Sequence, residues 1–411
     1  MAAVTWGRWW QGAGSGRDAE AMAGLAGVLT IEELRQRAKR RVPKMFYDYA
    51  DAGSWTEGTY RDNEADFGKI KLRQRIAVNM TDRSLRSTML GQTVAMPVAL
   101  APIGLLGMQV ADAEIKAAKA AEKAGVPFTL STMSIASIED VAENTGRPFW
   151  FQLYVMRDRT FIERLIDRAR AARCSALVLT MDLQILGQRH KDLRNGMSAP
   201  PKITPRFVFE MARKPAWALG MLGTKRRTFR NIVGHVEGAG DLTKLSAWTN
   251  AQFDPTLSWK DVSWVKDRFG GKVIVKGVLD AEDAAQAIAH GADAVIVSNH
   301  GGRQLDGAPS TIRVLPEIVD AVGDKTEVFI DGGIRSGQDV LKALALGARG
   351  TFIGRSYVYG LGAGGEAGVT RALEILAREL EVTMALCGER DVLDLGPHNI
   401  YSNELVKRQG Y

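Results

Sequence analysis

From about residue 97 onward the chain repeats one unit, a short apolar run that ends in small or polar residues and is followed by a helical pattern. Eight runs occur in order: PVALAP, VPFTLST, PFWFQLY, SALVLTMD, KVIVKG, DAVIVSNH, EVFIDGG and GTFIGR. The stretches between most of them, such as AEIKAAKAAEKAG, carry apolar residues at i, i+3, i+4 and i+7, which is typical of amphipathic helices. Apolar strands that alternate with helices predict a parallel sheet buried on both faces.

The number of units bears on how this sheet is arranged. Eight strand–helix units suit a closed (β/α)8 barrel, and a doubly wound open sheet is the alternative. Reactive residues stand at the C-terminal ends of the runs, where a barrel builds its active site. We therefore predict an α/β fold in which the strands close into a (β/α)8, or TIM, barrel.

Four parts of the chain lie outside the repeated units. Residues 30–90 begin with a helical pattern, in which Thr30 and Glu33 have the spacing of a capping box, and we expect them to cap one end of the barrel. The stretch between the fourth and fifth runs is too long for an ordinary connection, so it forms either an active-site lid or a separate surface device. The expected divisions are a mobile N-terminal tail at 1–29, the barrel domain at 30–395 with its insert at 196–259, and a C-terminal tail at 396–411.

Composition argues against several other classes of protein. The chain is 45% hydrophobic and 25% charged, as expected of a soluble globular protein with a substantial core. No apolar run approaches the roughly 20 residues that cross a bilayer, and the N-terminus lacks the apolar segment of a signal peptide. Two cysteines and five scattered histidines predict neither a disulfide framework nor a metal site. The net charge of +7 comes without a recognisable nucleic-acid-binding module, so we predict no nucleic-acid partner.

Glycine and arginine follow the last two runs, in IDGGIRSG and IGRS. In barrels, the loops after strands seven and eight and a nearby helix N-terminus commonly hold a phosphate. Glycine lets backbone amides approach the ligand, and Arg335 or Arg355 can neutralise its charge. Each motif alone fits a tight turn equally well, but the pair in matching positions favours a phosphate site.

The sixth run ends in a histidine, within VIVSNHGGRQLDG. At the mouth of a barrel, His300 can take a proton from a bound substrate, and Arg303 can hold a substrate carboxylate through two hydrogen bonds. Asp182, at the end of the fourth run, can orient the imidazole and stabilise its protonated form. The alternative is a structural histidine that satisfies loop backbone.

Two more pairs and a lysine end other runs. Lys276 follows KVIV, where a lysine is costly unless an anion meets it; a surface lysine at a frayed strand end is the alternative. Strand alternation places Thr180 on the same side as Asp182, and Gln152 on the same side as Tyr154. We therefore expect these side chains at the barrel mouth.

Together these residues resemble the FMN-dependent α-hydroxy acid dehydrogenase and oxidase family, which includes glycolate oxidase, L-lactate dehydrogenases and mandelate dehydrogenase. The resemblance covers roughly residues 30–395. SNHGGRQLDG is highly specific to the family, and PKMFYDYADAG, APIG, WFQLY, LTMD, VKG, DGGIRSG and IGR occur in the expected order. The basic insert and GQRHKDLRNGMS are most similar to the bacterial respiratory L-lactate dehydrogenases.

The resemblance implies a role for each matching residue. His300 is implied to be the base that receives the substrate proton, with Asp182 hydrogen-bonded to it. The substrate carboxylate is assigned to Arg303 and Arg189, aided by the hydroxyls of Tyr49 and Tyr154. Lys276 is implied to lie against the pyrimidine edge of FMN. The isoalloxazine ring is assigned to Ala101, Pro102, Ile103, Ser131, Gln152 and Thr180, with Ser298 close to the flavin or its ribityl chain. The ribityl and phosphate groups are assigned to Asp331, Gly333, Arg335, Gly354 and Arg355.

The implied reaction converts an L-2-hydroxy acid to a 2-keto acid while FMN is reduced. The overall resemblance to the L-lactate dehydrogenases favours L-lactate as the substrate. Gly104 stands where oxygen-using members often have alanine, which favours a dehydrogenase with an external quinone or cytochrome acceptor. Met133 stands where glycolate oxidase-like members have an aromatic residue and leaves the size of the substrate open. The alternatives are an oxygen-using oxidase, a mandelate-type dehydrogenase, and, in another class, a flavin- or phosphate-binding barrel without turnover.

The insert is the expected membrane contact. Residues 202–230 contain eight basic residues and one acidic residue. The expected interfacial segment comprises Trp217, Leu219, Met221 and Leu222 with the flanking basic residues Arg213, Lys214, Lys225, Arg226 and Arg227. A lid packed on its own barrel, with a solvated basic rim, is the alternative. We expect a cytoplasmic protein bound peripherally to the inner face of the cytoplasmic membrane, and the family resemblance implies a homotetramer.

Overall fold

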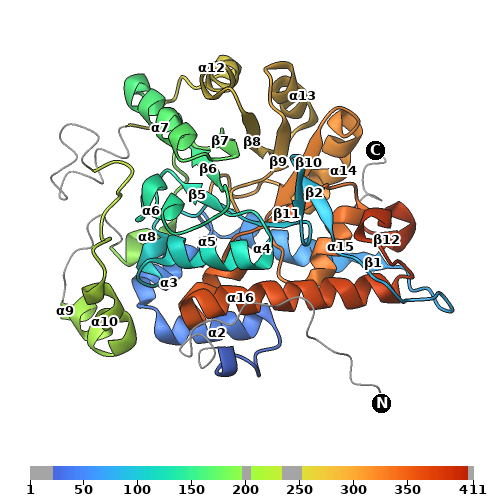
Figure 1. Ribbon diagram of the computed structural model, residues 1–411, viewed down its shortest axis with the longest axis horizontal. Helices are drawn as coiled ribbons and strands as arrows, with labels where there is room; N and C mark the ends of the chain where they lie inside the picture. The colour runs from blue at the N-terminus through green and yellow to red at the C-terminus, as the bar shows by residue number, and fades with distance from the viewer. Residues whose placement is uncertain (1–21, 197–204, 234–251, 406–411) are drawn as a thin grey trace.

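The structure is a computed structural model that describes residues 22–196, 205–233 and 252–405. Its centre is a sheet of eight parallel strands (Figure 1). In chain order these are β4 (Val98–Leu100), β5 (Thr129–Ser131), β6 (Trp150–Leu153), β7 (Ala176–Thr180), β8 (Lys272–Val278), β9 (Ala294–Val297), β10 (Glu327–Asp331) and β11 (Gly350–Ile353). Neighbours follow chain order from β5 to β11, and β4 pairs with β11.

The sheet closes on itself at the two strands that end this order. Leu100 forms a parallel bridge with Phe128, directly before β5, and the Leu100 amide donates to the carbonyl oxygen of Pro127 at 2.9 Å. Closure satisfies the backbone groups that an open sheet would leave at its edges. The predicted barrel is confirmed, and the open sheet is excluded.

A helix follows each barrel strand and covers it from outside. These helices are α5 (Ala113–Ala124), α6 (Ile138–Ala142), α7 (Arg159–Ala171), α12 (Trp259–Phe269), α13 (Ala281–Ala289), α14 (Thr311–Val322), α15 (Gly337–Ala345) and α16 (Arg355–Leu386). Their apolar stripes face the sheet, as in α7, where Phe161 and Leu165 are buried. Side-chain caps begin several of them, because Asp158 accepts from the amide of Phe161 and Ser336 from that of Asp339.

The interior of the barrel is built in layers. Trp150, Val178, Ile274, Ile296, Phe329 and Phe352, which come from different strands, are all buried in one inner cluster. Side chains two residues further along a strand face the same way, so a second inner layer lies nearer the C-terminal mouth. That layer contains Gln152, Thr180, Lys276, Ser298 and Asp331. The apolar layer therefore carries a polar layer directly above it.

The N-terminal cap forms largely as predicted. α2 (Ile31–Arg41) lies along α16, and α3 (Lys44–Ala50) and α4 (Gly58–Ala65) follow (Figure 1). Thr30 Oγ1 accepts from the Glu33 amide at 3.2 Å, but the Glu33 carboxylate accepts from the Leu29 amide instead of that of Thr30. Only half of the predicted capping box is present, because the Glu33 side chain reaches one residue further back.

Both expected tails are partly structured. Leu25 and Val28 are buried against the core, so residues 22–29 do not belong to a mobile tail; residues 1–21 lie outside the described residues. At the other end, β12 (Ile400–Asn403) pairs antiparallel with β1 (Ile70–Leu72), so this part of 396–411 is held in a two-stranded sheet. A hairpin of β2 (Ser87–Met89) and β3 (Gln92–Val94) adds Met89 and Val94 to the inner cluster.

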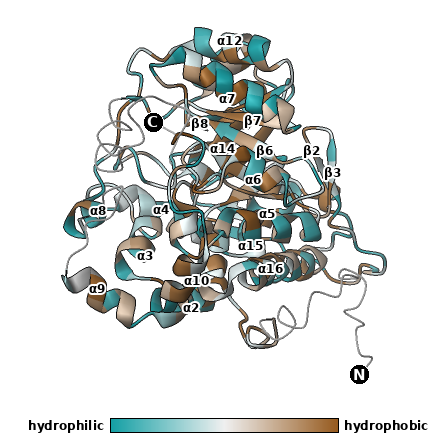
Figure 2. Cartoon of the chain, turned by 60° about the vertical axis from the view of Figure 1, so that its left-hand side comes forward, coloured by the Kyte–Doolittle hydropathy of each residue, from teal (hydrophilic) through white to brown (hydrophobic). Residues whose placement is uncertain are grey.

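The insert after β7 both packs on the barrel and extends from it. α8 (His190–Arg194) directly precedes the insert, whose described part includes α9 (Pro205–Ala212) and α10 (Pro215–Gly223), which lie to one side of the barrel (Figures 1 and 2). The return segment, residues 224–233, is anchored by the buried Phe229, Asn231 and Ile232. Among the described residues, no helix is long and apolar enough to cross a membrane.

Two residues of the predicted interfacial segment face the protein instead. The ring of Trp217 stacks on Phe46 at 5.4 Å, and its Nε1 donates to a main-chain carbonyl at 3.0 Å. Arg226 forms ion pairs at 3.0 Å with Asp112 and Asp140. These contacts hold the insert to the rest of the protein. The pattern of residues within the insert could not predict them, because their partners lie elsewhere in the chain.

Candidate active site

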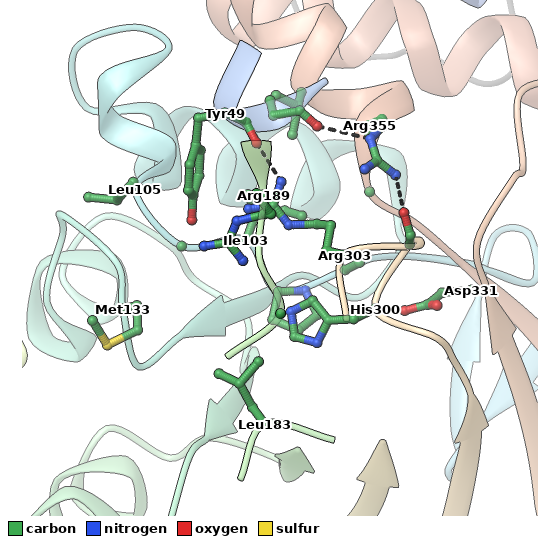
Figure 3. Close-up of a pocket in the computed structure, with 18 of the residues that line it drawn as sticks. Tyr49, Ile103, Leu105, Met133, Leu183, Arg189, His300, Arg303, Asp331 and Arg355 are labelled. Carbon is green, nitrogen blue, oxygen red and sulfur yellow. Dashed lines mark hydrogen bonds between the residues drawn. The ribbon is translucent and has the colours of Figure 1, made fainter. Parts of the chain in front are cut away.

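A cavity of about 600 Å³ opens at the C-terminal ends of the barrel strands. Figure 3 shows how residues distant in the chain converge on it. Fourteen of the predicted site residues line it: Tyr49, Ala101, Pro102, Ile103, Tyr154, Arg189, Lys276, His300, Arg303, Asp331, Gly333, Arg335, Gly354 and Arg355. The other five predicted residues, Asp182, Ser131, Gln152, Thr180 and Ser298, are not among the lining residues. They come from the same strand ends, and two of them bond to lining residues: Asp182 to His300 and Ser298 to Lys276.

His300 projects into the cavity from a strained loop. Its backbone is left-handed, with φ 57°, and its amide donates to Ser298 Oγ at 3.2 Å. The ring Nδ1 lies 3.0 Å from Asp182 Oδ1 and 3.2 Å from Oδ2. Because the carboxylate accepts at Nδ1, the other ring nitrogen, Nε2, is the atom left to accept a proton.

The pKa values of this pair favour a neutral base beside a charged carboxylate. Burial lowers the pKa of His300 below its usual 6.5, and the Asp182 carboxylate only partly offsets that effect. Burial alone would raise the pKa of Asp182, but His300 and Lys276 more than offset it, so this pKa lies below its usual value. At neutral pH the imidazole is therefore unprotonated and held by an anion.

Two arginines converge on the same side of the cavity as His300 (Figure 3). The guanidinium carbon of Arg303 lies 4.7 Å from the ring centroid of Tyr49, and that of Arg189 lies 5.9 Å from it. Arg189 Nε donates to Asp192 at 2.7 Å, and Arg303 donates to the main-chain carbonyl of Tyr49. Burial, reinforced by the charge of Arg189, lowers the pKa of Arg303 to about 10. Two close cations with one counter-anion form a site for an added carboxylate.

Lys276 lies in the polar layer with the anion that the sequence argument required. Its side chain is 5% exposed, and its Nζ lies 3.1 Å from Asp331 Oδ2 and 2.8 Å from Ser298 Oγ. Ser298 therefore positions both Lys276 and the backbone of His300. The second carboxylate oxygen of Asp331 is buried without a partner in the described structure.

Further unpartnered polar atoms lie in the polar layer. Gln152 Nε2 and Thr180 Oγ1 are buried and form no hydrogen bond within the described parts of the chain. Ser131 donates to Gln152 Oε1 at 3.0 Å, which turns the amide nitrogen of Gln152 outward as a donor. Buried polar groups are normally paired, so this set indicates a polar ligand. Donors and a hydroxyl placed together fit the polar edge of a flavin, and the free oxygen of Asp331 fits a ribityl hydroxyl.

The expected phosphate end of the cavity has the backbone for an anion, but its arginines already have partners. α16 begins at Arg355, so a helix N-terminus faces the cavity beside Gly354. The Arg355 guanidinium donates to main-chain carbonyls of Ala50, Ala52 and Gly301 at 2.7–2.9 Å. Arg335 pairs with Glu64 at 2.7 Å. Both arginines bring positive charge to this end and also fasten the N-terminal cap to it.

The cavity also has an apolar part of its lining. It includes Leu105, Met133, Leu183, Leu186, Leu193, Phe229 and Phe253. Phe229 and Phe253 both belong to the insert, and Phe253 packs edge-on against Tyr154 at 5.9 Å. A ligand whose carboxylate meets the arginines therefore directs its side chain toward a wall that the insert helps to build.

Sequence reasoning missed a buried cluster around Asp51. Its carboxylate accepts from the hydroxyls of Tyr47, Tyr60 and Tyr359 and from Arg35. The carbonyls on either side of Asp51 are those that accept from Arg355, so this cluster holds the cap in place over the phosphate end. Only the tyrosine-rich motif around 43–53 hinted at it.

Comparisons with known proteins agree with this geometry. Residues 38–402 match the model of the FMN-dependent dehydrogenase family. The L-lactate dehydrogenase of Vibrio parahaemolyticus is 47% identical over 368 residues, covering 88% of this chain and 96% of that protein. The L-lactate dehydrogenase of Caulobacter vibrioides is 46% identical over 370 residues, covering 90% and 96%.

A solved structure extends the comparison to the fold. The crystal structure of the monotopic membrane protein (S)-mandelate dehydrogenase superimposes with a TM-score of 0.88 at 36% identity, covering 92% of this chain and 100% of that one. The predicted resemblance and the predicted cofactor are confirmed, since the family match spans both the FMN-fitting polar layer and the His300 loop. The chain belongs to the FMN-dependent dehydrogenase family, and its cofactor is FMN.

Proposed function

We propose that the protein oxidises L-lactate, or a closely similar L-2-hydroxy acid, to the 2-keto acid and passes the electrons to an external quinone or cytochrome. The observation that carries the proposal is the meeting of an Asp182-held imidazole with two arginines at one cavity. A base and a carboxylate site within one cavity are what oxidation of a 2-hydroxy acid requires. The lactate dehydrogenases at 46–47% identity favour lactate as the substrate.

The arginines and the histidine divide the work on the substrate. Arg303 and Arg189 bind the carboxylate, with the hydroxyls of Tyr49 and Tyr154 at the same cavity as additional donors. This places the substrate hydroxyl toward His300, whose Nε2 accepts the proton. The imidazolium that results is stabilised by Asp182 at 3.0 Å.

The polar layer would hold FMN, which would supply the two-electron acceptor that the oxidation requires. We assign Lys276, Gln152, Thr180 and Ser131 to the polar edge of the ring, with the segment Ala101–Ile103 beside it. Asp331 and Ser298 serve the ribityl chain, and Gly333, Gly354, Arg335 and Arg355 serve the phosphate. The unpartnered atoms of Gln152, Thr180 and Asp331 support this assignment.

Anaerobic mixing with a hydroxy acid tests the function directly. Purified yellow protein is expected to lose its flavin absorbance within seconds of adding L-lactate without air, and to recover only slowly when air is readmitted. Rapid recovery would identify an oxidase, and no bleaching with any hydroxy acid would identify a binding protein without turnover. A panel that includes mandelate tests the second candidate substrate, which the apolar wall and the mandelate dehydrogenase fold both favour.

Replacing Asp182 by asparagine is expected to alter the pH profile as well as the rate. The carboxylate raises the pKa of His300, so its removal lowers that pKa further. Neutral His300 is the active form, and the acid limb of kcat/KM should therefore move to lower pH. Loss of imidazolium stabilisation should reduce kcat by about 10²- to 10⁴-fold at neutral pH. A variant with an unchanged acid limb would show that Asp182 does not act on His300.

We propose that α9 and α10 attach the protein to the inner face of the cytoplasmic membrane. Val208, Phe209, Leu219 and Leu222 are all more than half exposed on these helices, where Figure 2 shows hydrophobic residues. Exposed Arg213, Lys225 and Arg227 lie in or next to them. Apolar side chains beside cations suit the surface of an anionic bilayer. The relative described as a monotopic membrane protein shares this fold.

Substituting serine for Phe209, Leu219 and Leu222 together is expected to abolish sedimentation with anionic vesicles at low salt, while hydroxy acid oxidation persists. This variant spares the buried return segment, whose Phe229 lines the cavity. Leu305→Ser, at a position 63% exposed elsewhere on the surface, is the matched control and should still sediment. Unchanged sedimentation of the triple variant would exclude α9 and α10 as the anchor.

The homotetramer is a separate prediction. Measuring the mass of the detergent-free protein in solution tests it.

A further inference from the structure

We propose that Gln304 is a positioning residue that ties the loop carrying Asp182 and Arg189 to the loop carrying His300 and Arg303. The inference rests on the proposed function for the roles of those four residues. It concerns a side chain that does not line the cavity. Its argument comes from the bonds, the spacing and the charges of the two loops.

The side-chain amide of Gln304 bonds to the main chain of the opposite loop alone. Nε2 donates to the carbonyl oxygen of Asp182 at 2.6 Å and to that of Ile185 at 2.9 Å. Oε1 accepts from the amide of Gly187 at 3.0 Å. Both donor hydrogens and the acceptor oxygen are thus used on one stretch of five consecutive peptide units. Three hydrogen bonds from one side-chain amide to this main chain fix the path of the stretch. They do not depend on the side chains that the stretch carries.

The two loops also touch closely at Gly187. A Cβ atom built there would lie 2.5 Å from the carbonyl oxygen of Arg303 and 2.9 Å from the Cα of Gln304. Only glycine allows this approach, because real Cβ contacts are never so short. We call this contact between residues 182–187 and residues 303–304 the seam. It consists of the close main-chain approach at Gly187 and the three hydrogen bonds of Gln304.

The seam works against electrostatic repulsion. Arg189 and Arg303 flank the same tyrosine ring, and the nearby charge of Arg189 disfavours the charged form of Arg303. Asp192 bonds to Arg189 at 2.7 Å, and its charge also favours the charged form of Arg303, so it offsets part of this repulsion. Before a substrate carboxylate arrives, the like charges of Arg189 and Arg303 favour separation of the parts of the loops that carry them. A neutral amide can oppose that separation without adding a charge that competes with the substrate.

The same bonds reach the catalytic pair. Gln304 holds the carbonyl of Asp182, whose carboxylate meets His300 Nδ1 at 3.0 Å. One side chain therefore sets the spacing of the two arginines and the alignment of the imidazole. Loosening it should weaken carboxylate binding and shift the titration of His300 together.

The test compares Gln304→Met with the wild-type holoenzyme. Methionine is similar in length to glutamine but forms none of the three hydrogen bonds, so packing is largely kept. Oxalate, a carboxylate that cannot be oxidised as a hydroxy acid, is titrated against the flavin absorbance to obtain its Kd. We expect the Kd for oxalate and the KM for L-lactate to rise about tenfold, and the acid limb of kcat/KM to move to lower pH. Gln304→Ala should show the same changes in the oxalate Kd, the KM and the pH profile.

Leu305→Ala is the matched control, because the neighbouring side chain is 63% exposed on the same loop. It should leave the oxalate Kd, the KM and the pH profile unchanged. The proposal is overturned if Gln304→Met binds oxalate as the wild type does, or if it loses only thermal stability while its pH profile is retained. Failure of the wild type to be reduced by any hydroxy acid would instead remove the proposed function, and the oxalate titration would still test the seam.

Discussion

Glutamine in place of His300 should leave the protein yellow with bound FMN and lower the rate of flavin reduction by L-lactate by about 10²- to 10⁴-fold. Glutamine fills similar space and can still donate to Asp182, but it cannot accept a proton at the position of Nε2. The cofactor contacts in the polar layer do not involve the imidazole. Stopped-flow absorbance under anaerobic conditions measures the reduction rate directly.

His290→Gln provides the control for this substitution. His290 is the C-cap of α13, outside the barrel, and its Nδ1 lies 2.9 Å from the carbonyl oxygen of Gln286. Its replacement should leave flavin reduction at the wild-type rate. If His300→Gln kept more than about a tenth of the wild-type reduction rate, another group would have to be the proton acceptor.

Methionine in place of Arg303 should lower kcat/KM for L-lactate by roughly 10²- to 10³-fold, because a buried cation that meets the carboxylate is lost. Arg303→Lys should recover only part of this, since an ammonium cannot form the two parallel bonds of a guanidinium.

Arg349→Met is the matched control, at the start of β11 on the opposite end of the barrel. FMN content and thermal midpoint are measured for all three variants, because Arg303 also donates to the carbonyl of Tyr49. A kcat/KM within threefold of wild type in Arg303→Met, with FMN retained, would contradict the assignment of the substrate carboxylate to Arg303.

The barrel and the pairing of Asp182 with His300 could be predicted because their signals are local. Apolar runs at the strand period and amphipathic stretches at the helix period show where each unit begins and ends. Parallel strands bring all their C-terminal ends to one mouth, so Asp182 and His300 meet at 3.0 Å although 118 residues separate them. The lysine at 276 predicted an anion, and the structure supplies Asp331.

Contacts between segments without a shared period could not be predicted. Tryptophan is a residue type typical of membrane interfaces, yet the ring of Trp217 packs on Phe46. Arg355 stands in a phosphate motif, yet its guanidinium also fastens carbonyls of the N-terminal cap. Gln304 stood inside the most specific motif of the chain without a role, because its partners are main-chain atoms more than 110 residues away.

The amino-acid sequence by itself determined the order of strands and helices, the residues that end each strand, and the chemistry that they carry. Those properties depend on near neighbours along the chain, where side-chain type and spacing act directly. Only the tertiary structure decided which residues of the insert are exposed, how residues 22–29 and β12 are held, and which main-chain groups Gln304 bonds. Closure of the barrel selects those partners, since it alone brings distant main-chain segments within hydrogen-bond distance.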